Sequence, residues 1–175
     1  MGPGVAKLGE ALRTNHSLKK LFLANNQIDE NGMKEMAEGL RDNDTLEELY
    51  LSNNNISDPG LIFLAGFLEG NRTLQILDIS RNLFGPDGFG KFCEKLKDNA
   101  GLTHLICQRG RDQDLNLEPE GFECFKLLAE SIRSNQFLKV IDLHGTKVSK
   151  TLLTNNFQSA LQENIFLQEF KIKSS

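Results

Sequence analysis

Apolar residues recur along the chain in a pattern that repeats every 28 residues. Leu18, Leu46, Leu74 and Leu102 are spaced by this interval, and each of the first three opens the phrase Leu-x-x-Leu-x-(Leu/Ile)-x-x-Asn-x-(Ile/Phe). Its Leu-x-x-Leu-x-(Leu/Ile) part ends with apolar residues at alternate positions, as is typical of a short strand with one buried face. A fixed period of this length indicates a protein built from stacked repeats.

The second half of each unit has helical spacing instead. In the first unit Met33, Met36, Ala37 and Leu40 form an apolar stripe with steps of three and four residues, and the stripe returns one and two periods later. Such spacing predicts a helix with one buried face. Stacked strand–helix units predict an α/β fold, a right-handed βα solenoid with a parallel concave sheet and helices on the convex side.

The repeats predict a single domain over residues 1–175. They start near residues 18, 46, 74, 102 and 138. A helix at 4–14, with no strand before it, precedes them, and a terminal strand at 167–173 follows. We expect a chain that begins within a repeat to be part of a longer protein, or to cover its open end with a partner or with a second copy of itself.

Asparagine occupies two repeated positions. Asn26, Asn54 and Asn82 follow the first three strands, where the chain turns inward and backbone groups lack partners in the sheet. An asparagine amide both donates and accepts hydrogen bonds, so we predict a structural ladder rather than a catalytic row. The second position, in the loop after each helix, comprises Asn15, Asn43, Asn71, Asn99, Asn135 and Asn164. Its recurrence explains most Asn-x-Ser/Thr triplets without invoking glycosylation.

This phrase, its period and its helical return resemble the ribonuclease-inhibitor type of leucine-rich repeat over residues 1–173. That type occurs in ribonuclease inhibitor, NOD-like receptors, Ran GTPase-activating protein and the C-terminal domain of tropomodulin. The resemblance implies a horseshoe segment whose concave sheet, or the rim of that sheet, contacts another protein. We therefore expect a protein-binding scaffold, part of a larger regulatory or sensing protein.

Residues between the buried leucines should face the concave side of the sheet. Outward Phe22, Tyr50, Ile76 and Ile106 would form an exposed strip without a packing role, a composition typical of interface anchors. The alternative is that a terminal segment or a neighbouring molecule covers the strip. The predicted binding residues are Phe22, Tyr50, Ile76, Asp78, His104, Ile106, Asp142 and His144, with Arg81 and Arg109 in the adjacent loops.

Two units depart from the pattern. The fourth spans 36 residues, and Gly110 stands where the ladder asparagine is expected. The insertion, at 108–119, either marks a binding face or is a tolerated surface loop, because lengthening a loop costs little. The fifth unit has Thr146 at the asparagine position and a less regular helix, which fits a C-terminal capping unit.

Composition and charge argue against some classes of function. A net charge of −4 argues against general nucleic-acid binding, and no stretch approaches the ~20 apolar residues of a membrane helix. Residues 29–58 carry nine acidic and two basic side chains. These side chains form either a solvated face or a binding site for a basic partner. Cys93, Cys107 and Cys124 fall on core positions, and three cysteines without disulfide spacing fit an intracellular, cytoplasmic protein.

The sequence offers little for catalysis. His104 and His144 would lie too far apart on adjacent strands to share a metal, and no nucleophile accompanies Asp142 and His144. We expect no enzyme, cofactor or metal site. Two alternatives remain: activation of a small GTPase through Arg81 and Arg109, as the resemblance to Ran GTPase-activating protein permits, and a cytoskeletal role such as filament capping.

Overall fold

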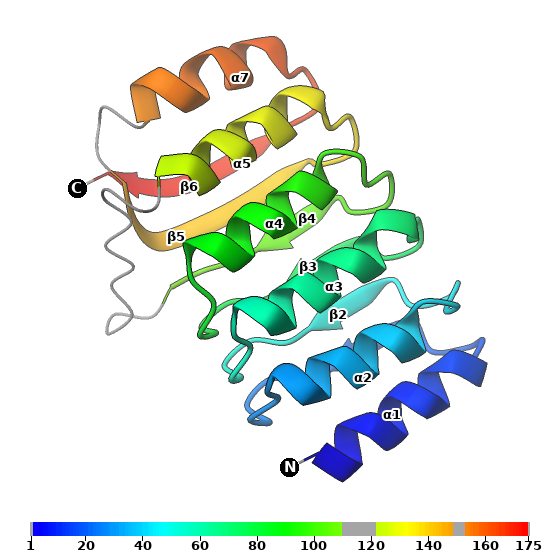
Figure 1. Cartoon of the computed structure of the whole chain (residues 1–175). Helices are drawn as coiled ribbons and strands as arrows, with labels where there is room; N and C mark the ends of the chain where they lie inside the picture. The colour runs from blue at the N-terminus through cyan, green and yellow to red at the C-terminus, as the bar shows by residue number, and fades with distance from the viewer. Residues whose placement is uncertain (1, 110–121, 149–152, 175) are drawn as a thin grey trace.

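The computed structural model describes residues 2–109, 122–148 and 153–174. Short strands form one layer and helices the other, and the units stack in chain order from one terminus towards the other (Figure 1). The predicted fold class, an α/β solenoid, is confirmed. No helix of the described ranges is long and apolar enough to cross a membrane.

The strands form one six-stranded sheet in which each pairs in parallel with the next along the chain. They are β1 (Lys20–Phe22), β2 (Glu48–Tyr50), β3 (Ile76–Asp78), β4 (His104–Ile106), β5 (Val140–Val148) and β6 (Glu169–Ser174). The middle residues of β2, β3 and β4 are fully buried, as is Ile141, which pairs with the middle residue of β4, in agreement with the alternation. Leu21 of β1 is half-buried because no described strand precedes it.

The helices cover one side of this sheet (Figure 1). They are α1 (Gly2–Thr14), α2 (Glu30–Leu40), α3 (Asp58–Gly70), α4 (Pro86–Leu96), α5 (Phe122–Ser134), a π-helical turn η1 (Leu153–Phe157) and α7 (Gln158–Glu163). Asp29 caps α2 by accepting a hydrogen bond from the backbone N–H of Gly32. Proline begins α4, where its missing N–H costs no hydrogen bond.

The asparagines after the strands bond to the backbone of neighbouring units. The amide nitrogen of Asn54 donates to the carbonyl oxygens of Leu23 and Leu51, both at 2.9 Å. Its oxygen accepts a 2.9 Å hydrogen bond from the N–H of Ile28. Asn82 repeats this arrangement one unit later. The amides thus satisfy backbone groups where the chain leaves the sheet.

A second set of asparagines joins the units at the opposite end of the strands. In each case the amide donates to the backbone oxygen of the equivalent asparagine one unit earlier, and the side-chain oxygen accepts from backbone N–H groups just downstream. The donors are Asn43, Asn71, Asn99, Asn135 and Asn164. The repeated loop position therefore has a structural role.

The fourth and fifth units differ from the others. Gly110 and nearly all of the predicted insertion at 108–119 lie outside the described residues. In the fifth unit β5 is nine residues long, and its pairing with β6 shifts register between Leu143 and Lys147. Gly145, with φ +87°, lies within this shift, a conformation that side chains disfavour. The π-helical turn η1 gives the irregular helix expected there.

Candidate binding surface

Two rows of residues cross the concave side of the sheet, because the strands pair with equivalent residues side by side. The central row is Phe22, Tyr50, Asp78, Ile106, Asp142 and Lys171. The neighbouring row is Lys20, Glu48, Ile76, His104, Val140 and Glu169. The register therefore brings most of the predicted binding residues onto one continuous surface.

The first two strands carry an aromatic stack, formed by Phe22 and Tyr50. The ring centroids are 4.6 Å apart and the ring planes differ by 3°. The Tyr50 hydroxyl donates a 2.8 Å hydrogen bond to Glu48, which also forms a 2.9 Å ion pair with Lys20. Phe22 is 67% exposed, so its ring remains in contact with solvent. The Tyr50 ring is fixed by stacking on Phe22 and by the hydrogen bond from its hydroxyl to Glu48.

These contacts change the protonation equilibria of the cluster. The hydrogen bond from Lys20, and then that from Tyr50, lower the pKa of Glu48. Burial raises the pKa of Tyr50, as do its hydrogen bond to Glu48 and the negative charges of Glu48 and Asp78. The neutral phenol is therefore the form that this surface favours. Because the pKa of Tyr50 is raised in the folded state, the contribution of the neutral phenol to stability is fully present below the unfolded-state pKa of about 10. It is lost as the pH rises through the higher folded-state pKa.

Replacing Glu48 by glutamine is expected to lower the pKa of Tyr50, because the variant removes an anionic acceptor and its charge. Tyr50 is the only tyrosine and the chain has no tryptophan, so ultraviolet absorbance of tyrosinate follows this group alone. Glu38→Gln, which neutralises an exposed carboxylate on α2, is the matched control and should leave the titration unchanged. An equal shift in both variants would contradict the Tyr50–Glu48 contact.

Two carboxylates lie on the central row beyond the aromatic stack. Asp78 is half-buried, and one of its oxygens accepts a 2.9 Å hydrogen bond from the N–H of Ser80. Asp142 is only 8% exposed, and its two oxygens accept from the His144 N–H at 2.9 Å and from the Gln108 side chain at 2.8 Å. Asp142 therefore lies on the predicted face, but adjacent groups bond to it and cover it.

The predicted strip of four exposed residues is exposed only in part. Phe22 is exposed as expected, but Tyr50, Ile76 and Ile106 are half-buried, because side chains of adjacent strands shield one another across a short spacing. Asp78 separates Tyr50 from Ile106 along the central row. The surface therefore consists of an exposed aromatic end followed by alternating acidic and aliphatic side chains.

The two predicted histidines differ in environment. His104 is half-buried and its Nδ1 lies 2.9 Å from the hydroxyl of Thr103, whereas His144 is exposed. Within the described ranges, no group of three or more His, Cys, Asp or Glu side chains could hold a metal ion.

The two predicted arginines have different roles. Arg81 is exposed at a loop position with φ +53°. Arg109 is only 9% exposed: its guanidinium lies 4.2 Å from the ring centroid of Phe84 and donates to the backbone oxygens of Asn82 and Phe84, both at 3.1 Å. The prediction that Arg109 lies in an exposed loop is wrong. Its side chain folds inward and bonds the backbone at the end of the asparagine ladder.

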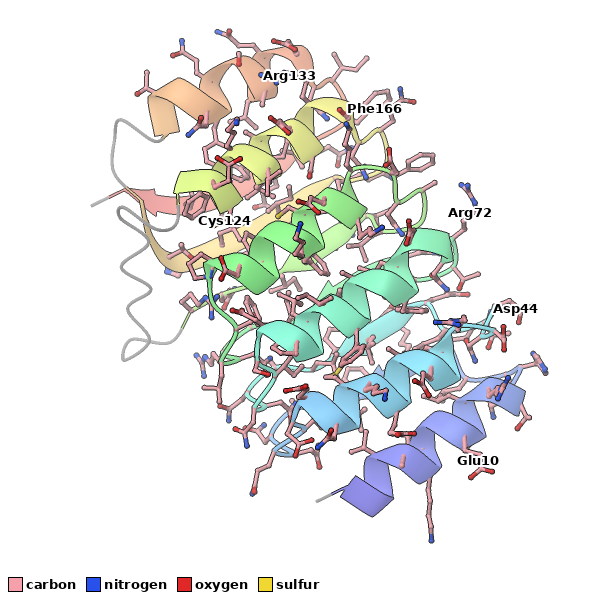
Figure 2. All side chains as sticks on the ribbon, viewed as in Figure 1. Glu10, Asp44, Arg72, Cys124, Arg133 and Phe166 are labelled. Atoms are coloured by element: carbon pink, nitrogen blue, oxygen red, sulfur yellow. The ribbon has the colours of Figure 1, made fainter. Side chains whose placement is uncertain are left out.

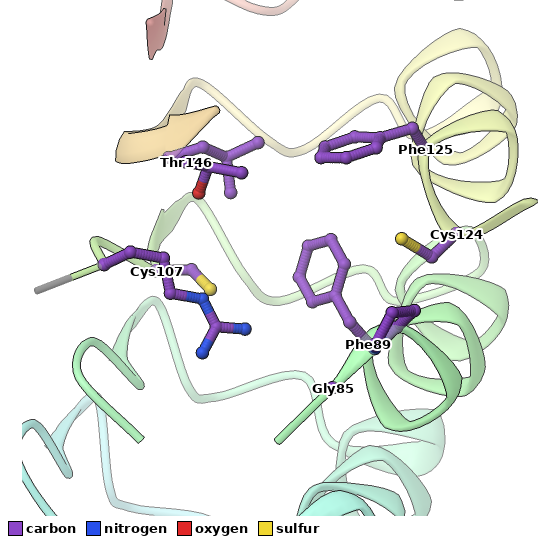
Figure 3. A pocket seen from close by; sticks show the side chains of 9 residues that line it. Gly85, Phe89, Cys107, Cys124, Phe125 and Thr146 are labelled. Carbon is purple, nitrogen blue, oxygen red and sulfur yellow. The ribbon is translucent and has the colours of Figure 1, made fainter. Parts of the chain in front are cut away.

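Arg109 also lines a cavity of about 10 Å³, room for about one water molecule, between the sheet and helices α4 and α5 (Figure 3). Cys107 and Cys124 face it from opposite sides. Burial raises the pKa of Cys107 to about 11 and that of Cys124 to about 12, and it also raises the pKa of Cys93. All three cysteines are buried, which confirms the prediction that they are core residues. Their thiols therefore stay protonated at neutral pH.

Basic residues that precede this segment balance part of the acidic excess of residues 29–58, at Asp42, Glu47 and Glu48. Three ion pairs join the two units, and His16 lies 3.3 Å from Asp44. The ion pairs are Arg13–Asp42, Lys19–Glu47 and Lys20–Glu48. The residues adjoining β2 are thus a solvated, paired face rather than an open acidic site.

Some residues of this surface were not predicted from the sequence. Lys20 and Glu48 were not among the predicted binding residues, although Glu48 and Tyr50 stand two apart on one strand and must share a face. Away from this surface, exposed Phe137, Ile165 and Phe166 were not predicted either; they lie in the loops after α5 and α7. Phe166 extends from the same edge of the solenoid as Asp44 and Arg72 (Figure 2). Their position two or one residues after the loop asparagines was the available signal.

The comparisons with known proteins agree with this architecture. A leucine-rich-repeat family model matches residues 14–37, 42–65 and 70–93. No curated protein matches the chain. Among solved structures, the tropomodulin C-terminal domain of Caenorhabditis elegans is 18% identical, with a TM-score of 0.72 over 92% of this chain and 93% of that one.

A second solved structure, described as leiomodin-1 actin-binding site 2, is 23% identical, with a TM-score of 0.58 over 75% of this chain and 74% of that one. At such identities the likeness establishes the fold. Together with the matched repeats and the parallel sheet, it shows that the chain has the fold of a leucine-rich-repeat solenoid, similar to the tropomodulin and leiomodin-1 structures.

Proposed function

We propose that this solenoid is a non-catalytic scaffold that binds a protein partner through its concave sheet, with the aromatic stack at the centre of the contact. The observation that carries the proposal is that the ring of Phe22 is exposed to solvent although it stacks against the ring of Tyr50. An exposed aromatic ring that is already fixed by stacking can bury apolar area with little loss of side-chain entropy, as interface anchors do.

Actin is the first partner to test. One solved structure with this fold is described as an actin-binding site, and the cytoskeletal alternative predicted from the sequence points the same way. The identity of 23% supports a shared fold only, so actin binding by this chain is a proposal. Binding to a regulatory protein other than actin is compatible with the same surface.

Phe22→Ala is expected to weaken partner binding by at least about tenfold, since truncating a central aromatic anchor costs on the order of 2 kcal/mol. The measurement is co-sedimentation with actin filaments and titration of labelled monomeric actin. Phe137→Ala, a matched truncation of a 46% exposed phenylalanine on the loop edge, should leave binding unchanged. Thermal unfolding of both variants checks that neither has lost its fold.

The opposite result, loss with Phe137→Ala and retention with Phe22→Ala, would move the binding site to the loop edge. If neither form of actin binds, actin is removed as the partner. The same pair of variants then compares partners captured from cell extract and identified by mass spectrometry. A partner retained by both variants would contradict the concave site.

The GTPase-activating alternative has less support from this geometry. Arg109, one of its two proposed arginines, is buried and donates to backbone oxygens, so reaching a nucleotide would break these bonds. Arg81 is exposed and remains a candidate. Unchanged GTP hydrolysis by small GTPases in the presence of the protein would close this alternative.

A further inference from the structure

We propose that the concave surface recognises an arginine side chain of its partner, held between the ring of Tyr50 and the carboxylate of Asp78. This inference rests on the proposed binding function and specifies the chemistry of the partner at that same surface.

The charges of the two concave rows point to a cationic ligand. Of their six Asp, Glu, Lys and Arg side chains, four form ion pairs with one another. The pairs are Lys20–Glu48 at 2.9 Å and Lys171–Glu169 at 2.9 Å. The remaining two, Asp78 and Asp142, are both acidic, and in the described part of the chain their hydrogen-bond donors are neutral groups. Lys171, the register partner of Asp142, offsets part of this charge. The two rows still carry four acidic side chains against two basic ones, so the surface has an excess of negative charge.

The aromatic stack adds a second preference for a cation. Phe22 covers one face of the Tyr50 ring from β1, so the other face lies on the side of β3. Asp78 is the residue of β3 paired with Tyr50, and neighbouring strands lie about 4.8 Å apart. A cation over this ring face therefore meets both the ring quadrupole and a carboxylate.

Arginine fits this arrangement better than lysine. A planar guanidinium stacks on an aromatic ring while its N–H groups donate to a carboxylate beside it. Asp78 can accept such a bond, because only one of its oxygens has a donor within the described ranges. Glu48 holds the Tyr50 hydroxyl, which keeps the ring in place for stacking.

The test uses N-acetylated, amidated hexa-arginine as the probe and follows the fluorescence of Tyr50, the only tyrosine in a chain without tryptophan. We expect a saturable change with hexa-arginine and none over the same concentrations with hexa-citrulline, which has a similar shape without the charge. Asp78→Asn should weaken binding by about fivefold or more, because the amide keeps the Ser80 contact but lacks the charge.

Two controls separate this site from general charge attraction. Glu38→Gln removes one negative charge from α2 and should change the affinity by less than about twofold. Tyr50→Leu, measured with fluorescein-labelled hexa-arginine, should weaken binding as much as Asp78→Asn. Equal weakening by Glu38→Gln and Asp78→Asn, or equal binding of hexa-citrulline, would overturn the proposal.

Failure of this inference is distinguishable from failure of the proposed function. If hexa-arginine leaves Tyr50 fluorescence unchanged while Phe22→Ala still abolishes partner binding, the concave surface stands and arginine recognition is wrong. If Phe22→Ala also has no effect on partner binding, both proposals fall.

Discussion

Replacing Asn82 by alanine is expected to destabilise the folded protein by about 3 kcal/mol, among the larger effects of a single polar substitution. Asn82 is 1% exposed. Its amide nitrogen donates to the carbonyl oxygens of Leu51 and Ile79, both at 3.0 Å, and to that of Ser80 at 3.2 Å. Its oxygen accepts a 3.1 Å hydrogen bond from the N–H of Ile56. Alanine leaves these buried backbone groups without partners.

The measurement is the midpoint of thermal unfolding, which should fall by roughly 6–12 °C for a chain of this size. Asn26→Ala is the matched control, because Asn26 occupies the same position of the first unit but is exposed. Among the described residues its side-chain amide donates only to the Ala24 oxygen, at 2.9 Å. It should cost less than about 0.5 kcal/mol. Equal losses in both variants would mean that burial between units does not determine the strength of the ladder.

Gly39→Ala is expected to be about as damaging, for a steric reason. A methyl group at Gly39 of α2 would overlap the carbonyl carbon and oxygen of Gly9 in α1, and one at Gly9 would lie 2.6 Å from the oxygen of Glu35. The two helices therefore cross at backbone contact, and forcing them apart costs about 1–3 kcal/mol or more. Since no strand precedes α1 among the described residues, α1 should separate from α2 first.

Hydrogen exchange gives a local measurement of this effect. Amides of α1 should lose protection in Gly39→Ala while those of α3 and α4 keep it. Gly66→Ala is the matched control: Gly66 is exposed in α3 and a methyl group there meets nothing within 4 Å. That variant should gain up to about 1 kcal/mol from helix propensity. Retained protection of α1 in Gly39→Ala would contradict the close crossing.

Strand register was predictable from sequence because the repeat period and the alternation agree. A slip of one residue would turn Leu49 and Leu77 towards solvent and bury Tyr50 and Asp78, so a single register satisfies the core. The asparagine positions were predictable for a similar reason, since a polar side chain recurring beside buried leucines needs backbone partners.

The role of Arg109 was not predictable from its place in the repeat. The period puts it beside Gly110, which stands where the ladder asparagine is expected. Its inward conformation depends on two carbonyl oxygens and an aromatic ring from the preceding unit, at Asn82 and Phe84. The residues next to Arg109 in the sequence indicate neither how close it lies to these groups nor how far water is excluded from them.

By itself the sequence determined the solenoid, its register and the set of side chains that face the concave side, because repetition and periodicity act through local geometry. Tertiary structure decided which of those side chains are available to a partner. Phe22 is exposed and Asp142 is covered, although both lie on the same row. The difference arises because exposure depends on the size and hydrogen bonds of neighbours on adjacent strands, which come together only when the units stack.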